Sequence, residues 1–277
     1  MVATRRNARS LGAAIAAALL GLGGAAACGT SPGRSDGADS AGSASQEDRR
    51  PPEQRFQWSA KAPDPHGVEV YAPPAGEGHG QVLSTATRTY DPGSTQARES
   101  RPENIIFQIT DLGGIHPVAF STSDGPTGFD GLVPVGYTQS AAGAALAAQA
   151  YMTAPTGQGY GDLVERVVED ATDADRRSAR QHSDRMAGDA EMKERSVAGY
   201  YPASEGARVD LVAADRAEVM IYERGQKADG SVGFFGRPLS LHWAEGRWKI
   251  SSFRKFPRMW EGDQLPPEAW QWVKHSN

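Results

Sequence analysis

The clearest pattern along the chain is an alternation of apolar and polar residues in its C-terminal third. Residues 207–214 (ARVDLVAA) and 216–225 (RAEVMIYERG) both alternate, and residues 237–253 (RPLSLHWAEGRWKISSF) alternate on either side of a short turn. Successive side chains of a strand point to opposite faces, so this period of two predicts antiparallel strands with one buried face.

The last of these segments is typical of a β-hairpin. Glu245 and Gly246 supply the turn, in which glycine accepts a positive φ. Ser240 and His242 share the face opposite the apolar residues. The predicted buried face carries Leu239, Leu241, Trp243, Trp248 and Ile250.

Earlier segments predict two strands and then helices. Residues 103–110 (ENIIFQIT) and 114–122 (GIHPVAFST) read as strands, and 137–152 (YTQSAAGAALAAQAYM) reads as an alanine-rich helix capped by Thr138 or Ser140. Because its surface is made of small residues, we expect another element to approach this helix closely.

Two further helical segments are expected before the strands. Residues 162–171 place Leu163, Val164, Val167 and Val168 on one stripe, and the charge-rich residues 173–196 predict a mostly solvated helix that packs through Ala179, His182 and Met186. Residues 266–275 (PPEAWQWVKH) predict a short capped helix or an aromatic tail.

The first 27 residues have the pattern of a signal peptide. Three arginines precede an uncharged run from Leu11 to Ala27, and a polar segment follows. The run is short and rich in Ala and Gly for a membrane span, although a permanent anchor helix is an alternative. We expect cleavage between Ala27 and Cys28.

The sequence Ala25-Ala26-Ala27-Cys28 resembles the lipobox of bacterial lipoproteins, with Ala25 where that motif most often has Leu. The resemblance implies a diacylglyceryl group on the Cys28 sulfur, with acyl chains such as palmitate, and a protein anchored on the extracytoplasmic face of the cell membrane. Two acyl chains hold a protein firmly, whereas one chain binds marginally. The alternative is a secretory signal whose cysteine is incidental.

Residues 28–102 are expected to form a tether. Residues 29–55 contain almost no large apolar residue, which predicts disorder, whereas residues 56–102 carry isolated aromatics among many Pro and Gly and either pack locally or stay mobile. A single α+β domain is then expected over residues 103–277.

Charge and cysteine content exclude several function classes. Removal of residues 1–27 leaves 26 basic and 34 acidic residues, a formal net charge of −8, which argues against nucleic acid as a partner. With one cysteine the chain can form neither an intramolecular disulfide nor a paired-cysteine zinc site. We expect no cofactor and no metal.

No candidate catalytic group has a supporting context. Residues 29–33 match G-x-S-x-G, but Ser31 lies in the predicted tether rather than between a strand and a helix. None of the histidines has a tight ligand spacing; they are His66, His79, His116, His182, His242 and His275. Aromatic residues are the best binding candidates, with ordinary core packing as the favoured alternative: Tyr200, Tyr201, Phe234, Phe235, Trp260, Trp270 and Trp272.

Helices followed by long antiparallel strands and a W-x-x-x-x-W hairpin over residues 140–256 resemble the nuclear transport factor 2-like (cystatin-like) fold, in which a curved sheet packs on helices. Residues 113–152 and the hairpin also resemble an uncharacterised family of exported proteins of high-GC Gram-positive bacteria that is linked to conjugative elements. The residues that carry this second resemblance are Pro117, Gly125, Pro126, Gly136, Tyr137, Gly143, Ala144, Leu241, Trp243, Gly246, Trp248 and Lys249, whereas Gln139 and Arg247 depart from it.

The sequence therefore predicts a non-catalytic lipoprotein that binds or scaffolds an envelope protein, with a conjugation or secretion system as one setting. The alternative is a small-molecule binder or enzyme that uses the cavity of a cone-shaped fold.

Overall fold

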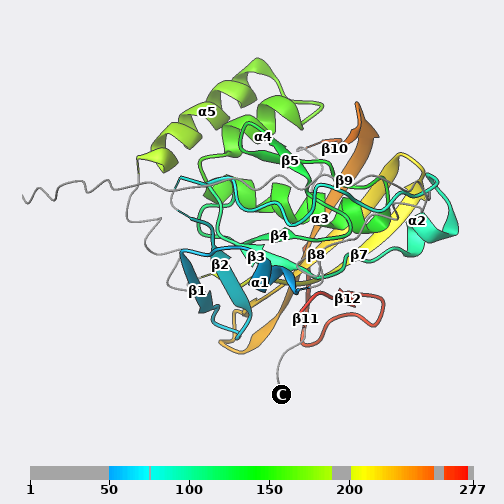
Figure 1. Ribbon diagram of the computed structural model, residues 1–277, viewed down its shortest axis with the longest axis horizontal. Coiled ribbons are helices and arrows are strands. Elements are labelled where there is room, and N and C mark those ends of the chain that lie inside the picture. Colours follow the sequence, from blue (N-terminus) through cyan, green and yellow to red (C-terminus); the bar gives the residue numbers. More distant parts are fainter. Residues whose placement is uncertain (1–49, 75, 189–200, 253–258, 274–277) are drawn as a thin grey trace, which may run out of the picture. The chain divides into compact units, whose positions relative to one another are not determined.

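The centre of the fold is α3 (Ala141–Thr153), a helix buried along almost its whole length. The computed structural model describes residues 50–74, 76–188, 201–252 and 259–273, and α3 contacts both of the larger sheets among them: β4 of one sheet, and β7, β8 and β9 of the other. Figure 1 shows α3 in the middle of these strands. A helix that is apolar all round is stable only when it is enclosed in this way.

The two larger sheets are antiparallel except for one pair. The first has the order β1-β2-β3-β4, in which β2 and β3 run parallel, and the second has the order β10-β9-β8-β7-β12, with β11 added to β9. A separate hairpin joins β5 to β6. The strands are β1 Ala60–Pro63, β2 Glu69–Ala72, β3 Ile106–Gln108, β4 Val118–Phe120, β5 Gly128–Asp130, β6 Val133–Val135, β7 Ser204–Ala213, β8 Arg216–Gln226, β9 Val232–Ala244, β10 Arg247–Ile250, β11 Trp260–Gly262 and β12 Trp270–Gln271.

This architecture confirms the predicted α+β class and most of the predicted strands. In the hairpin of β9 and β10, Trp248 pairs with Trp243, and the turn residues Glu245 and Gly246 have φ of 52° and 73°. Positive φ at both central positions is the geometry that matches the twist of a two-residue hairpin. The predicted inner face is buried at Leu239, Leu241, Trp248 and Ile250 and half-buried at Trp243.

The alanine-rich helix forms where the sequence predicts it. Ser140 is its N-cap, and its hydroxyl accepts a hydrogen bond from the Gly143 amide. Gly143 is required because a Cβ there would lie 2.0 Å from the Thr138 carbonyl oxygen. The small side chains allow the close approach of other elements that the sequence predicts.

Gln149 is the one long polar side chain in this buried helix. Its Oε1 accepts a hydrogen bond from the Ala119 amide at 2.8 Å, and its Nε2 donates to the Pro117 carbonyl at 2.8 Å and to the Ser204 hydroxyl at 3.3 Å. The side-chain amide therefore pairs with the backbone of β4, the last strand of its sheet, as a neighbouring strand would, and also reaches β7.

The first helix after α3 ends earlier than predicted. α4 (Tyr160–Arg166) follows the short 3-10 turn η2 (Ala154–Thr156). The predicted continuation to residue 171 is wrong, because Val168 instead forms a parallel bridge with Ile250. The predicted stripe of Leu163 and three valines is nevertheless buried.

α5 (Asp173–Ala187) begins with a capping box in which Thr172 and Asp175 satisfy each other's backbone amides. Most side chains of α5 are exposed or half-buried, whereas Ala179 is buried, as predicted. The expected continuation to residue 196 lies outside the described residues from 189 onward. α4 and α5 pack against each other beside β10 in the view of Figure 1.

The C-terminal segment differs from the helix that was one of its two predicted forms. Residues 270–271 form β12, which pairs with Ala207 and Gly206 of β7. A helix is wrong here because the extended backbone completes the hydrogen bonds of β7, and the Trp272 amide also donates to the Glu205 carbonyl.

The described part of the predicted tether contains regular structure. It carries α1 (Pro52–Arg55), β1, β2 and α2 (Thr95–Glu99). Because β2 pairs with β3, the sheet crosses the boundary drawn at residue 103. Of the two alternatives for residues 56–102, the structure shows local packing, with Tyr71 and Leu83 buried in the core.

Candidate functional site

The residues with the strongest sequence assignment lie outside the described part of the chain. These are Ala27 and Cys28 at the predicted cleavage and lipidation site, and Ser31 of the G-x-S-x-G match. Among the helices that the structure describes, none combines the length and the apolar character that crossing a bilayer requires.

Four of the histidines make local contacts. His242 lies on the face opposite the core, with Nδ1 2.9 Å from Glu169 Oε1. His182 approaches the Pro155 carbonyl at 2.8 Å. His79 packs edge-on against Phe129 at the rim of an open hollow of about 750 Å³, and the His66 amide donates to Asp64. Within the described residues, no three His, Cys, Asp or Glu side chains are grouped as a metal site would need.

His116 differs from these, because it lies in a cluster that sequence reasoning did not find. Its ring lies 4.7 Å from that of Tyr201, and the ion pair of Glu223 with Arg237 is close enough to influence its charge. Burial lowers the pKa of His116 below its ordinary value, and Arg237 acts in the same direction while Glu223 opposes it. The imidazole is therefore mainly neutral at pH 7 and can donate one hydrogen bond and accept another.

The predicted aromatic candidates separate into buried and accessible groups. Trp270 is buried beneath Arg101, and Trp272 packs against Phe107 with ring centroids 6.5 Å apart. Core packing therefore accounts for these two tryptophans. Tyr200 lies outside the described residues.

The accessible group lies at the free end of the β8–β9 hairpin. Val232 is 59% exposed, and Phe234 is half-buried under the Arg224 guanidinium, 5.2 Å from its ring centroid. Trp260 of β11 stands edge-on to Tyr222 at 5.4 Å, opposite Gly236 of β9. We call Val232, Phe234 and Trp260 the hairpin-end patch. Apolar and aromatic side chains with an arginine beside them are the composition that protein interfaces favour.

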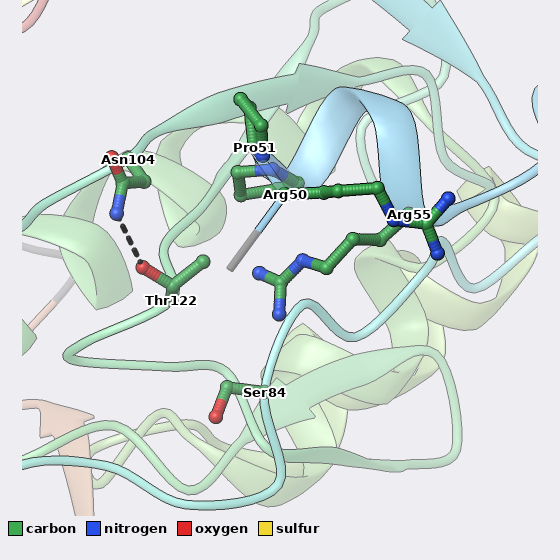
Figure 2. Close-up of a pocket in the computed structure, with 7 residues that line it drawn as sticks. Arg50, Pro51, Arg55, Ser84, Asn104 and Thr122 are labelled. Carbon is green, nitrogen blue, oxygen red and sulfur yellow. Dashed lines mark hydrogen bonds between the residues drawn. The ribbon is translucent and has the colours of Figure 1, made fainter. Parts of the chain in front are cut away.

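A polar hollow lies beside α1 at the beginning of the described chain. Its volume is about 390 Å³. Figure 2 shows the Arg55 side chain reaching from the end of α1 into the space near Thr122 and Ser84. The lining residues are Arg50, Pro51, Pro52, Arg55, Ser84, Asn104 and Thr122.

The walls of this hollow are fixed by backbone and side-chain contacts. Asn104 has a φ of 49°, uncommon for a residue with a side chain, and its amide donates to the Thr122 hydroxyl at 3.0 Å. Arg55 Nε is buried without a hydrogen-bond partner among the described residues. A buried donor without a partner costs about 1–3 kcal/mol, and more when it is charged.

Most other buried polar groups are committed to structural hydrogen bonds. Asp124, fully buried, accepts from the hydroxyls of Tyr90 and Thr138 through Oδ1 and from the Ser123 hydroxyl through Oδ2. Asp64 accepts from backbone amides, including that of Ala203. Such carboxylates hold segments together and are not presented to a substrate.

Sequence reasoning missed three functional or structural residues, and one of them had a usable signal. Gln149 is the only amide in a run of small residues, which suggests a buried partner. Two of the partners of Asp124, Tyr90 and Thr138, come from other segments, as do the residues around Arg55, so no local pattern indicates these groupings.

Comparison with known proteins gives one result. A family model described as "Domain of unknown function (DUF8175)" matches residues 69–264, from β2 to just beyond β11. No curated protein and no solved structure matches the chain.

Proposed function

Because the chain belongs to the DUF8175 family of domains of unknown function, whose description assigns no activity, we propose a function from the residues of the chain itself. The protein is a lipid-anchored, non-catalytic binding or scaffold module on the extracytoplasmic face of the cell membrane. Its partner is an envelope protein, and a component of a conjugation or secretion system is the class to test first.

The observation that carries this proposal is the sequence Ala25-Ala26-Ala27-Cys28 at the end of a short uncharged run. Small residues before a single cysteine are what lipidation and cleavage require. A diacylglyceryl group on Cys28 then holds the folded part at the membrane, since two acyl chains bind stably.

The packing of the second sheet is compatible with a scaffold role. α3 contacts β7, β8 and β9, and its side chains there are buried. Long antiparallel strands packed on a central helix are also compatible with the nuclear transport factor 2-like (cystatin-like) arrangement, which we retain as part of the proposal. The hairpin-end patch is then the surface offered to the partner.

The anchor is tested by metabolic labelling with a palmitate analogue. We expect label in the wild-type chain and in Ser31→Ala, which leaves the cysteine in place, and none in Cys28→Ser. Equal labelling of wild type and Cys28→Ser would refute the anchor.

The partner surface is tested by site-specific photocrosslinking in cells. A crosslinking residue at Phe234 is expected to capture an envelope protein, whereas one at Arg177, exposed on α5, is the matched control. Val232→Asp should abolish capture by placing a charge in the patch. Equal capture from both positions, or capture insensitive to Val232→Asp, would argue against this surface.

A further inference from the structure

The polar hollow beside α1 has the composition of an anion site. Its lining includes two arginines and the polar side chains of Ser84, Asn104 and Thr122, and no acidic residue. The carboxylate of the neighbouring Glu103 is held by Arg88 and does not line the hollow. The whole chain carries a formal net charge of −5, so attraction of an anion depends on this local positive charge.

We propose that this hollow binds a phosphate group, with Arg55 as its principal ligand. A guanidinium presents several N–H donors in a planar fork that matches two phosphate oxygens. Arg55 Nε is buried without a partner among the described residues, and the side chain extends into the hollow (Figure 2). An oxyanion in the hollow would accept hydrogen bonds from the guanidinium end of this side chain.

The other walls define the size of the ligand. The Asn104 amide is held in place by its hydrogen bond to Thr122, so both side chains are positioned before a ligand arrives. The volume of about 390 Å³ lies within the range of small-molecule sites and exceeds the space that a bare ion fills. The geometry points to a phosphate ester, either a soluble one or the headgroup of a phospholipid.

The hollow lies close in the sequence to the predicted lipidation site, because Arg50 follows Cys28 by 22 residues. The lipid source rests on the proposed anchor at Cys28, whereas binding of a phosphate ester by the hollow does not.

The test uses the full chain carrying Cys28→Ser, so that no lipid of its own contributes to binding. Glycerol phosphate is titrated in a calorimeter, and vesicles of phosphatidylglycerol are used in a sedimentation assay. Arg55→Gln should weaken binding about tenfold or more, which is the loss of one charge-assisted hydrogen-bonded contact. Arg177→Gln, the same charge change on exposed α5, should alter it less than about twofold, the scale of a remote exposed charge.

The two arms distinguish the two sources. If glycerol phosphate gives a heat of binding with the wild-type residue at position 55 and none with Arg55→Gln, the hollow is a site for soluble esters. If the protein sediments with the vesicles and Arg55→Gln does not, the hollow is a site for a phospholipid headgroup. Absence of both, or equal weakening by Arg177→Gln, would overturn the proposal.

A second variant guards against misfolding. Arg55→Lys keeps the charge but loses the planar fork, so we expect binding weaker than wild type and stronger than Arg55→Gln. Circular dichroism compares the fold of each variant with that of the wild type. Binding by Arg55→Lys and Arg55→Gln at the wild-type level would equally overturn the proposal. Because these measurements use a chain that lacks Cys28, they can succeed when the palmitate labelling fails, and fail when it succeeds.

Discussion

Replacing Gln149 by methionine tests whether a side-chain amide holds the last strand of the first sheet. Methionine has a similar length, so the change removes hydrogen bonds with little change in volume. It leaves the buried Ala119 amide and the buried Pro117 carbonyl without the partners that each contacts at 2.8 Å. Each unsatisfied backbone group costs about 1–3 kcal/mol, so we expect a loss of about 2–4 kcal/mol after the gain from burying a more apolar side chain.

This loss is measurable and has a clear control. Urea unfolding of the full chain carrying Cys28→Ser, followed by tryptophan fluorescence, gives the change in the free energy of unfolding. Leu146→Met, in the same buried helix, conserves volume and breaks no hydrogen bond, so it should cost under about 1.5 kcal/mol. Hydrogen exchange at the Ala119 amide should accelerate only in Gln149→Met. A change below about 0.5 kcal/mol in Gln149→Met would refute the role assigned to the amide, since it is the range of ordinary surface substitutions.

Three further predictions concern single positions. Alanine usually stabilises a helix relative to glycine by about 1 kcal/mol, but Gly143→Ala should lower the thermal midpoint by several degrees because the new Cβ would lie 2.0 Å from the Thr138 oxygen; Gly188→Ala, with no atom closer than 3.6 Å, is the control. Burial lowers the pKa of His116 below its ordinary value of 6.5, so the contribution of the neutral imidazole to stability is present above pH 6.5 and is lost as the pH falls through the folded-state pKa. When urea midpoints are measured from pH 7.5 to pH 5, the midpoint of His116→Gln should therefore fall less steeply with pH than that of the wild type. Equal slopes for the two proteins would contradict the assignment. Glu245→Asn should raise the thermal midpoint by the equivalent of about 0.5 kcal/mol, because asparagine accepts the positive φ of the hairpin turn more readily, and a lower midpoint would show that the ion pair of Glu245 with Lys249 matters more.

The period of the hydrophobic pattern was enough to predict the long strands and the buried helix. In β8 and β9 each strand has one face toward α3, so alternation is strong and its direction is unambiguous. The helix α3 was predicted from alanine content and the Ser140 cap, both of which are local properties.

Contacts between distant segments explain what the sequence did not predict. Val168 leaves the helical pattern because Ile250, 82 positions later, offers its backbone. Trp270 is extended because it pairs with Ala207 on the side of β7 that does not face β8. The short strands β1 and β2 lie among prolines and glycines, and only their pairing with β3 makes them regular.

The candidate sites were less predictable than the fold. The sequence indicated the aromatics of the β8–β9 hairpin, but not which of them stay accessible. The hollow beside α1 unites Arg55 with Asn104 and Thr122, and the His116 cluster unites a loop with two strands. Neither grouping can be recognised from residue spacing in the sequence, because its members lie on different elements of the fold.

The enclosure of α3 has a consequence for how this chain can diverge. A stretch such as AAGAALAA, with little variety and no charge, would pass for the segment most open to substitution. Because sheets lie against it on more than one side, a larger residue at nearly any of its positions must displace a strand. We therefore expect this low-complexity stretch to tolerate substitution least, whereas the exposed charged positions of α5 should tolerate most substitutions. A deep mutational scan would show this as a block of intolerance centred on residues 141–153.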